Sequence, residues 1–120
     1  IWIKFEKKFL NLWETENYGD AYPKVLFKKN SKKMILEKKM YMQNLFEESI
    51  SYAGAKIIRR IYGFAHNIDF EWIENTKVRA NCEYKASSLA IEMLKNTNSF
   101  KSINDLIKAA AINENMKVKL

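Results

Sequence analysis

The chain has 120 residues, which corresponds to one domain or part of one. Hydrophobic residues make up 48% of it and charged residues 29%, which is ordinary for a globular protein and excludes disordered and collagen-like classes. It contains three glycines and one proline, too few turn residues for an all-β sandwich or barrel. The composition therefore predicts an all-α fold.

The net charge of +7 comes from 21 basic and 14 acidic residues, and only three of the basic residues are arginines. A basic chain can bind nucleic acid, but lysine, asparagine and isoleucine are frequent throughout, as in proteins encoded by AT-rich genomes. The lysine pairs are typical of exposed helix faces and have few aromatic residues between them. These pairs are Lys28-Lys29, Lys32-Lys33 and Lys38-Lys39. The charge pattern thus disfavours nucleic acid as a partner.

The chain has one cysteine, Cys82, and one histidine, His66. A single cysteine excludes an intrachain disulfide and favours a reducing, cytoplasmic compartment, and the two residues together do not make a zinc site. No apolar run of 18 residues is present, so we expect no membrane span, and we find no signal peptide. Because the chain starts at Ile1, without Met, and helical spacing begins at once, we expect it to be part of a longer protein.

Helical periodicity predicts a first helix over about residues 1–16, which ends at the breaker cluster around Gly19 and Pro23. A second helical stretch follows over about 31–64, with a kink or break expected at 51–55, where Gly54 and other small residues would also let another backbone approach closely. Each stretch carries an apolar stripe. The first consists of Trp2, Phe5, Phe9, Leu12 and Trp13; the second of Tyr41, Leu45, Ser49, Ala53, Ile57, Arg60 and Phe64, widened by Met42, Phe46, Ile50 and Ile61.

The rest of the chain predicts a short helical turn within 67–74, a helix over about 76–95 and a last helix that begins after Ser102. Ser102 and Asp105 have the spacing of a capping box. We expect Trp72 in the core. The inward faces are predicted as Val78, Cys82, Ala86, Leu89 and Met93 in the first of these helices and Ile103, Leu106, Ile107 and Ala110 in the last. The predicted organisation is one helical domain, residues 1–112, followed by a polar tail, 113–120, with four main helices and one helical turn.

Arg59 and Arg60 form the most informative pair. Arg60 falls on the predicted apolar face, where an unpaired guanidinium would be costly, and Arg59 lies about 100° around the helix. One interpretation pairs Arg60 with an internal carboxylate, Asp69 or Glu74. In the other, the two arginines line a pocket for a phosphate or a polyhydroxylated ligand, whose oxygens suit the planar guanidinium fork.

No other residues form a complete active site. His66 could shuttle protons near neutral pH, but a capping or packing role is the simpler interpretation. Cys82, in the middle of a predicted helix, is expected to be a buried, inert thiol. The three glycines lie too far apart for a phosphate-binding loop, and no carboxylate cluster with metal-ligand spacing is present. We therefore predict no catalytic residue and no metal ligand in this chain.

The central block, residues 45–66 with Asp69-Phe70 and Ile73-Glu74, resembles the C-terminal part of the S-methyl-5-thioribose kinase family. The resemblance extends over about residues 2–108 and departs in the lysine-rich stretch 28–39 and in the tail. Supporting positions are Phe5, Phe9-Leu10, Leu12-Trp13, Tyr22-Pro23, Arg79-Ala80, Cys82-Glu83, Ser102-Ile103 and Asp105-Leu106.

The resemblance implies a fold and a function. The chain would be the helical end of the C-lobe of a kinase in the aminoglycoside-phosphotransferase and protein-kinase-like superfamily. The parent enzyme would phosphorylate methylthioribose with ATP and Mg²⁺ in methionine salvage, with the ligands of both cofactors upstream of this chain. Arg59 and Arg60 match the family's substrate-binding arginine pair. The chain alone would be inactive. Because a separated end of the C-lobe would expose apolar surface, we also expect self-association, for example as a homodimer.

A second hypothesis belongs to another class: the chain is a small basic helical module for protein interaction or nucleic-acid binding, with its lysines as the contact face. The coding sequence upstream of Ile1 discriminates the two hypotheses. A kinase requires a glycine-rich hairpin and an H-x-D catalytic loop there, whereas a module requires neither.

Overall fold

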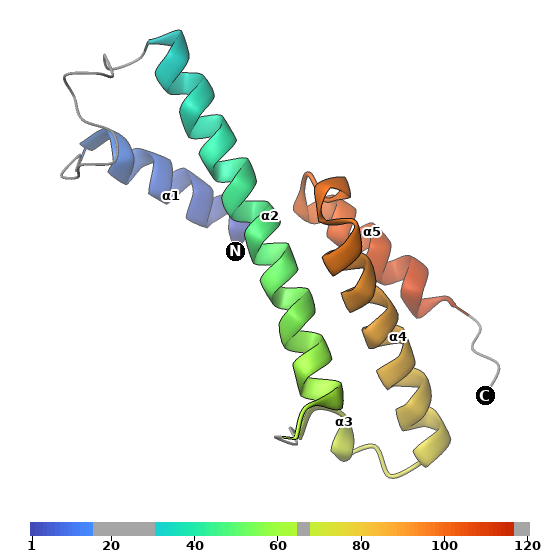
Figure 1. The fold of residues 1–120 in the computed structure, drawn as a ribbon. Helices are drawn as coiled ribbons and strands as arrows, with labels where there is room; N and C mark the ends of the chain where they lie inside the picture. Colours follow the sequence, from blue (N-terminus) through green and yellow to red (C-terminus); the bar gives the residue numbers. More distant parts are fainter. Residues whose placement is uncertain (16–30, 65–67, 117–120) are drawn as a thin grey trace. The chain divides into compact units, whose positions relative to one another are not determined.

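The computed structural model describes residues 1–15, 31–64 and 68–116, and this part of the chain contains helices and no strand, so the all-α prediction is confirmed (Figure 1). The helices are α1 (Trp2–Thr15), α2 (Lys32–Tyr62), α3 (Ile68–Glu71), α4 (Thr76–Lys95) and α5 (Ile103–Glu114), with a 3-10 turn, η1 (Thr97–Ser99), between the last two. The breaker cluster around Gly19 and Pro23, the pair Lys28-Lys29 and His66 lie outside the described residues. The chain divides into two compact units, Ile1–Leu45 and Phe46–Leu120.

The first unit pairs α1 with the beginning of α2 through aromatic rings. The ring of Tyr41 stacks on Phe9 at a centroid distance of 5.8 Å and meets Trp13 edge-on at 5.1 Å. Met34 and Met42 are the buried side chains of this unit's α2 segment. The predicted stripe of α1 is only half correct, because Phe5 and Leu12 are exposed, whereas Trp2, Phe9 and Trp13 are partly covered.

The second unit consists of the remainder of α2 with α3, α4, η1 and α5. Gly54 lies directly against α4: a Cβ built on it would be 2.9 Å from the carbonyl oxygen of Ala90 and 3.1 Å from the Cβ of Met93. The predicted close approach at Gly54 is therefore confirmed. The core of this unit also contains Phe100, which follows η1 and is 2% exposed.

The predicted break at 51–55 is wrong, since α2 continues through this segment to Tyr62. A glycine inside a helix costs about 1 kcal/mol relative to alanine. The close packing of α2 against α4 offsets that cost, and a larger residue at position 54 would block this packing. The predicted apolar face of α2 is partly confirmed. Met42, Phe46 and Ile50, which were expected to widen it, are buried together with Gly54, whereas Tyr41, Ser49, Arg60 and Phe64 of its central row are exposed.

Further burial predictions are corrected. Cys82 is partly exposed and Val78 is exposed, whereas Met93 of the same predicted face is buried together with Ser87 and Ala90. Trp72, which directly follows α3, is exposed, and Ile107 is exposed while Ala109 is buried. α5 also continues to Glu114, and Asn113, expected in a polar tail, is 4% exposed and donates to the carbonyl oxygen of Ala109 at 3.0 Å.

Candidate functional site

Arg59 and Arg60 lie in the last turn of α2, and both are exposed. Cations are stabilised at this end of a helix by the partial negative charge of its free carbonyl groups. The prediction that Arg60 lies on a buried apolar face is wrong, because the covered face of α2 is the neighbouring one. Its guanidinium is therefore in a partly solvated place, and its side chain is 39% exposed.

Asp69, on α3, is the partner of Arg60. The Nε of Arg60 lies 2.5 Å from Oδ2 of Asp69, and its Nη2 donates to Oδ1 at 3.0 Å, so that the two groups meet edge to edge. Of the two carboxylates considered from the sequence, Asp69 and Glu74, the structure brings Asp69 to the arginine. A bidentate pair of this kind is stronger and more directional than a single contact. It ties the end of α2 to α3.

Asp69 is itself held in place by Trp72. The indole Nε1 of Trp72 donates to the carbonyl oxygen of Asp69 at 2.8 Å, and the backbone N–H of Ile73 donates to the carbonyl oxygen of Phe70 at 3.0 Å. Sequence reasoning missed Trp72 in this role, because its bulk suggested a core position. A tryptophan three residues after an acidic residue in a short helical turn is the signal that was available.

Arg59 differs from its neighbour. Its side chain makes no hydrogen bond or ion pair with any residue in the described part of the chain. Its carbonyl oxygen accepts the N–H of Gly63 at 2.9 Å, and a Cβ on Gly63 would lie 2.1 Å from the same oxygen. Gly63 therefore lets α2 end in this conformation, directly after the arginine pair.

Large apolar side chains surround the arginine pair in the sequence and are open to solvent. Phe64 is 100% exposed and Trp72 is 72% exposed, and Tyr62 and Ile68 are exposed as well. Single exposed apolar residues are normal in soluble proteins. Here four such residues fall within eleven consecutive positions of the sequence.

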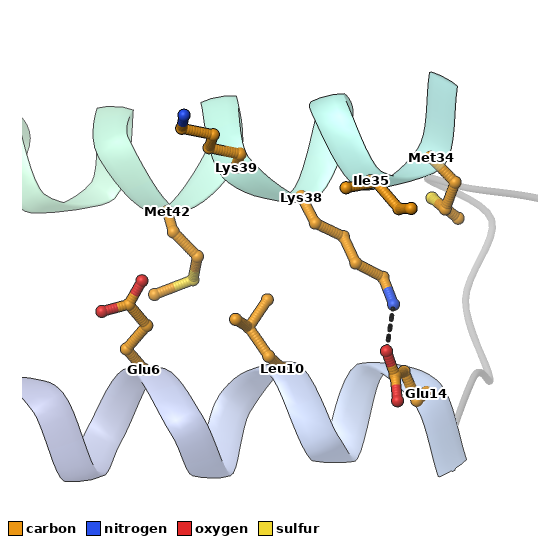
Figure 2. Close-up of a pocket in the computed structure, with 8 residues that line it drawn as sticks. All are labelled: Glu6, Leu10, Glu14, Met34, Ile35, Lys38, Lys39 and Met42. Carbon is orange, nitrogen blue, oxygen red and sulfur yellow. Dashed lines mark hydrogen bonds and ion pairs between the residues drawn. The ribbon is translucent and has the colours of Figure 1, made fainter. Parts of the chain in front are cut away.

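A second candidate is a pocket of about 310 Å³ in the first unit, between α1 and the beginning of α2 (Figure 2). Leu10 and Met42 point toward each other across it, and Nζ of Lys38 contacts Oε1 of Glu14 at 3.2 Å on its rim. The Lys38 ammonium also lies 5.9 Å from the centre of the Trp13 ring. The floor of this pocket is apolar, and the charges of Lys38 and Glu14 on its rim neutralise each other. We therefore interpret it as a packing groove between the two helices and not as a reactive site.

The described residues do not fit a bound metal or nucleotide. Among them, no group of three or more His, Cys, Asp or Glu side chains is close enough to hold a metal ion. No glycine-rich loop is present either, because Gly54 lies inside α2 and Gly63 directly follows it. In the described part of the chain, no helix is both long and apolar enough to cross a membrane.

The amino-acid sequence of the chain is similar to those of known proteins. No protein-family model matches the chain. Curated proteins do match, among them kinases from a plant and from bacteria. The chain spans about a quarter of the length of these relatives, so the similarity concerns one part of a larger enzyme.

The relatives are methylthioribose kinases. The chain is 41% identical to methylthioribose kinase 1 of Oryza sativa subsp. japonica over 108 residues, which cover 88% of this chain and 25% of that protein. It is 32% identical to the Escherichia coli enzyme over 111 residues, and 35% identical to a Bacillus cereus enzyme over 94 residues, covering 92% and 78% of this chain and 26% and 21% of those proteins. The resemblance inferred from the central block is therefore confirmed: the chain is homologous to part of a methylthioribose kinase.

Proposed function

We propose that this chain is the C-terminal, helical part of the C-lobe of an ATP-dependent methylthioribose kinase, and that Arg59 and Arg60 serve the sugar substrate. The observation that carries the proposal is the identity of 41% and 32% to enzymes of this name over 88% and 92% of the chain. The exposed arginine pair at the end of α2 supports the assignment of the site, because guanidinium groups bind the oxygens of polyhydroxylated ligands.

In this proposal the chain contributes binding and orientation, and no catalytic residue. Bound ATP with Mg²⁺ supplies the phosphoryl group, and the residues that hold it belong to parts of the kinase outside this chain. The arginines of α2 hold the sugar, and the bidentate contact with Asp69 limits the rotamers that Arg60 can adopt. Holding a substrate in a reactive geometry is a large share of the catalytic effect in phosphoryl transfer.

Replacing either arginine by lysine in the full-length kinase tests the site. Lysine keeps the charge and loses the planar fork, so we expect kcat/KM for methylthioribose to fall while the KM for ATP stays unchanged. Removing one charge-assisted contact of this kind costs about 2–4 kcal/mol, a fall of about 30- to 1,000-fold. A matrix of initial rates over both substrates measures the effect. Arg79→Lys, on α4, is the matched control.

A variant with lowered melting temperature and normal kinetics would contradict the substrate role of that arginine. A full-length protein that does not phosphorylate methylthioribose at all would overturn the proposed function as a whole. In that case the basic helical module of the second hypothesis becomes the better account of the lysines.

The 120-residue chain alone is expected neither to bind ATP at micromolar concentration nor to transfer phosphate. A Mg²⁺-nucleotide needs backbone donors aimed at its phosphates and carboxylate ligands for its metal, and the described residues contain no cluster of three or more side chains that could hold a metal ion. Isothermal titration calorimetry with ATP and Mg²⁺ checks this. A stoichiometric, Mg²⁺-dependent binding signal would contradict it.

A further inference from the structure

The two arginines of the candidate site differ in their hydrogen bonds. Arg60 uses two of its five N–H donors, one on Nε and one on Nη2, for the carboxylate of Asp69. The donors on Nη1 and the second N–H of Nη2 are not part of this contact. Arg60 is therefore held along one edge, and its guanidinium plane is set by α3.

The residue that holds Arg60 is anchored independently. Asp69 lies in the first turn of α3, which has four residues and packs against α4. A helix of this length is not stable by itself, and the indole of Trp72 fixes the backbone of Asp69 from the other end of the turn. The backbone of Asp69 thus has a defined place, from which its carboxylate reaches Arg60.

Arg59 has no counter-charge among the residues that the structure describes. The helix positions that neighbour it are occupied by Ala55, Lys56, Tyr62 and Gly63, none of which is acidic. Lys56 adds a second exposed positive charge one turn earlier on this face. No described residue therefore occupies the donors of Arg59, which can serve a ligand that carries oxygens.

We propose that the two arginines have separate tasks, a division that rests on the proposed function. Arg59 contacts the oxygens of the sugar substrate directly. Asp69 is a positioning residue that acts through Arg60: the Asp69–Arg60 pair fixes the last turn of α2 against α3 and thereby sets where the Arg59 guanidinium points.

Nuclear magnetic resonance of the 120-residue chain tests the first half of this proposal without any catalysis. The chain has three arginine Nε–H groups to distinguish. We expect the Nε–H of Arg60 to exchange with water more slowly than that of Arg59, and Asp69→Asn to abolish the difference. Equal exchange of the two groups in the unmodified chain would overturn the proposal.

Kinetics of the full-length kinase test the second half. Arg59→Lys is expected to lower kcat/KM for methylthioribose by about 30- to 1,000-fold without changing the melting temperature. Asp69→Asn is expected to lower it by about 10- to 100-fold through misplacement, and Asp69→Glu, which keeps the charge, to recover most of that loss. In an Arg60→Lys background, Asp69→Asn should add little, because both changes break the same pair.

The control for Asp69→Asn is Glu47→Gln, which makes the same chemical change at another ion pair of this unit, Lys101–Glu47, at 2.9 Å. Both variants should have a slightly lower melting temperature, and only Asp69→Asn should have a lower kcat/KM for methylthioribose. If Asp69→Asn behaves as Glu47→Gln does, or if Arg60→Lys is impaired and Arg59→Lys is normal, the division of tasks is wrong. If both arginine variants are folded and kinetically normal, the proposed substrate site itself fails.

Discussion

Asp105 stabilises the start of α5 through its carboxylate. The hydroxyl of Ser102 donates to Oδ2 at 2.9 Å, and the backbone N–H of Lys101 donates to the same oxygen at 3.1 Å. The predicted capping box is thus half formed, since the carboxylate reaches back while the Ser102 hydroxyl makes no hydrogen bond to the helix backbone. The Ser102 hydrogen bond is the main reason that the pKa of Asp105 lies below its ordinary value of 3.8.

This shift predicts a dependence of stability on pH. A carboxyl group whose pKa is lower in the folded state stabilises that state above its unfolded pKa, and the contribution is lost as pH falls through the folded pKa. Asp105→Asn should therefore lower the free energy of unfolding at neutral pH and make no difference at pH values below the folded pKa. Urea denaturation across this range measures it.

The control for Asp105→Asn is Glu48→Gln, which removes an exposed carboxylate of α2. If the free energies of unfolding of Asp105→Asn and the unmodified chain differ by the same amount at every pH, the charge of the Asp105 carboxylate does not cause the difference in stability.

At the scale of helices, the contact of α2 with α4 depends on Gly54. The covered row of α2 runs through Phe46 and Ile50 to Gly54, and the missing side chain lets the helix reach the backbone of Ala90. The backbone carbonyl at 2.9 Å cannot move aside as a flexible side chain could. Gly54 is therefore required for the close packing of α2 against α4.

Gly54→Ala is expected to destabilise the chain. Forcing a methyl group into a packed contact costs about 1–3 kcal/mol, which exceeds the gain of about 1 kcal/mol from helix propensity. The melting temperature and the free energy of unfolding measure the net effect. Asn44→Ala, at an exposed position of α2, should be neutral or stabilising. A stabilised Gly54→Ala variant would mean that the two helices do not approach this closely.

At the scale of the whole molecule, many large apolar side chains of the described residues are exposed to solvent. Among the described residues, the exposed large apolar side chains of the second unit include Tyr52, Tyr62, Phe64, Ile68 and Trp72. In the longer kinase we propose, other parts of the protein would cover this surface. The chain by itself must leave it in water or cover it with another copy.

We therefore expect the isolated chain to associate with itself. Its average mass in light scattering should rise with concentration, because burial of apolar surface drives association. Phe64→Asp, which places a charge at a fully exposed position, should weaken the association without unfolding the chain. A strictly monomeric species at high concentration would contradict this prediction.

Local patterns were enough to predict where the helices lie. The spacing of apolar residues and the caps predicted the helix Thr76–Lys95 at its exact bounds, and the start of α5 after Ser102. These features depend on residues within about four positions of one another. For the same reason, the central block was sufficient to recognise the relationship to methylthioribose kinases, which 41% identity to the rice enzyme confirms.

The sequence by itself determined that the chain is helical, where most helices begin and end, and to which enzymes it is related. Only the tertiary structure decided which face of each helix is covered, that Arg60 pairs with Asp69 while Arg59 pairs with no residue of the described ranges, and that Trp72 is exposed. The stripes of α2 and α4 are wide enough for two adjacent rows to serve as the inner face. The neighbouring helix selects one of them, because only the row with Gly54 and Ala90 lets the two backbones meet.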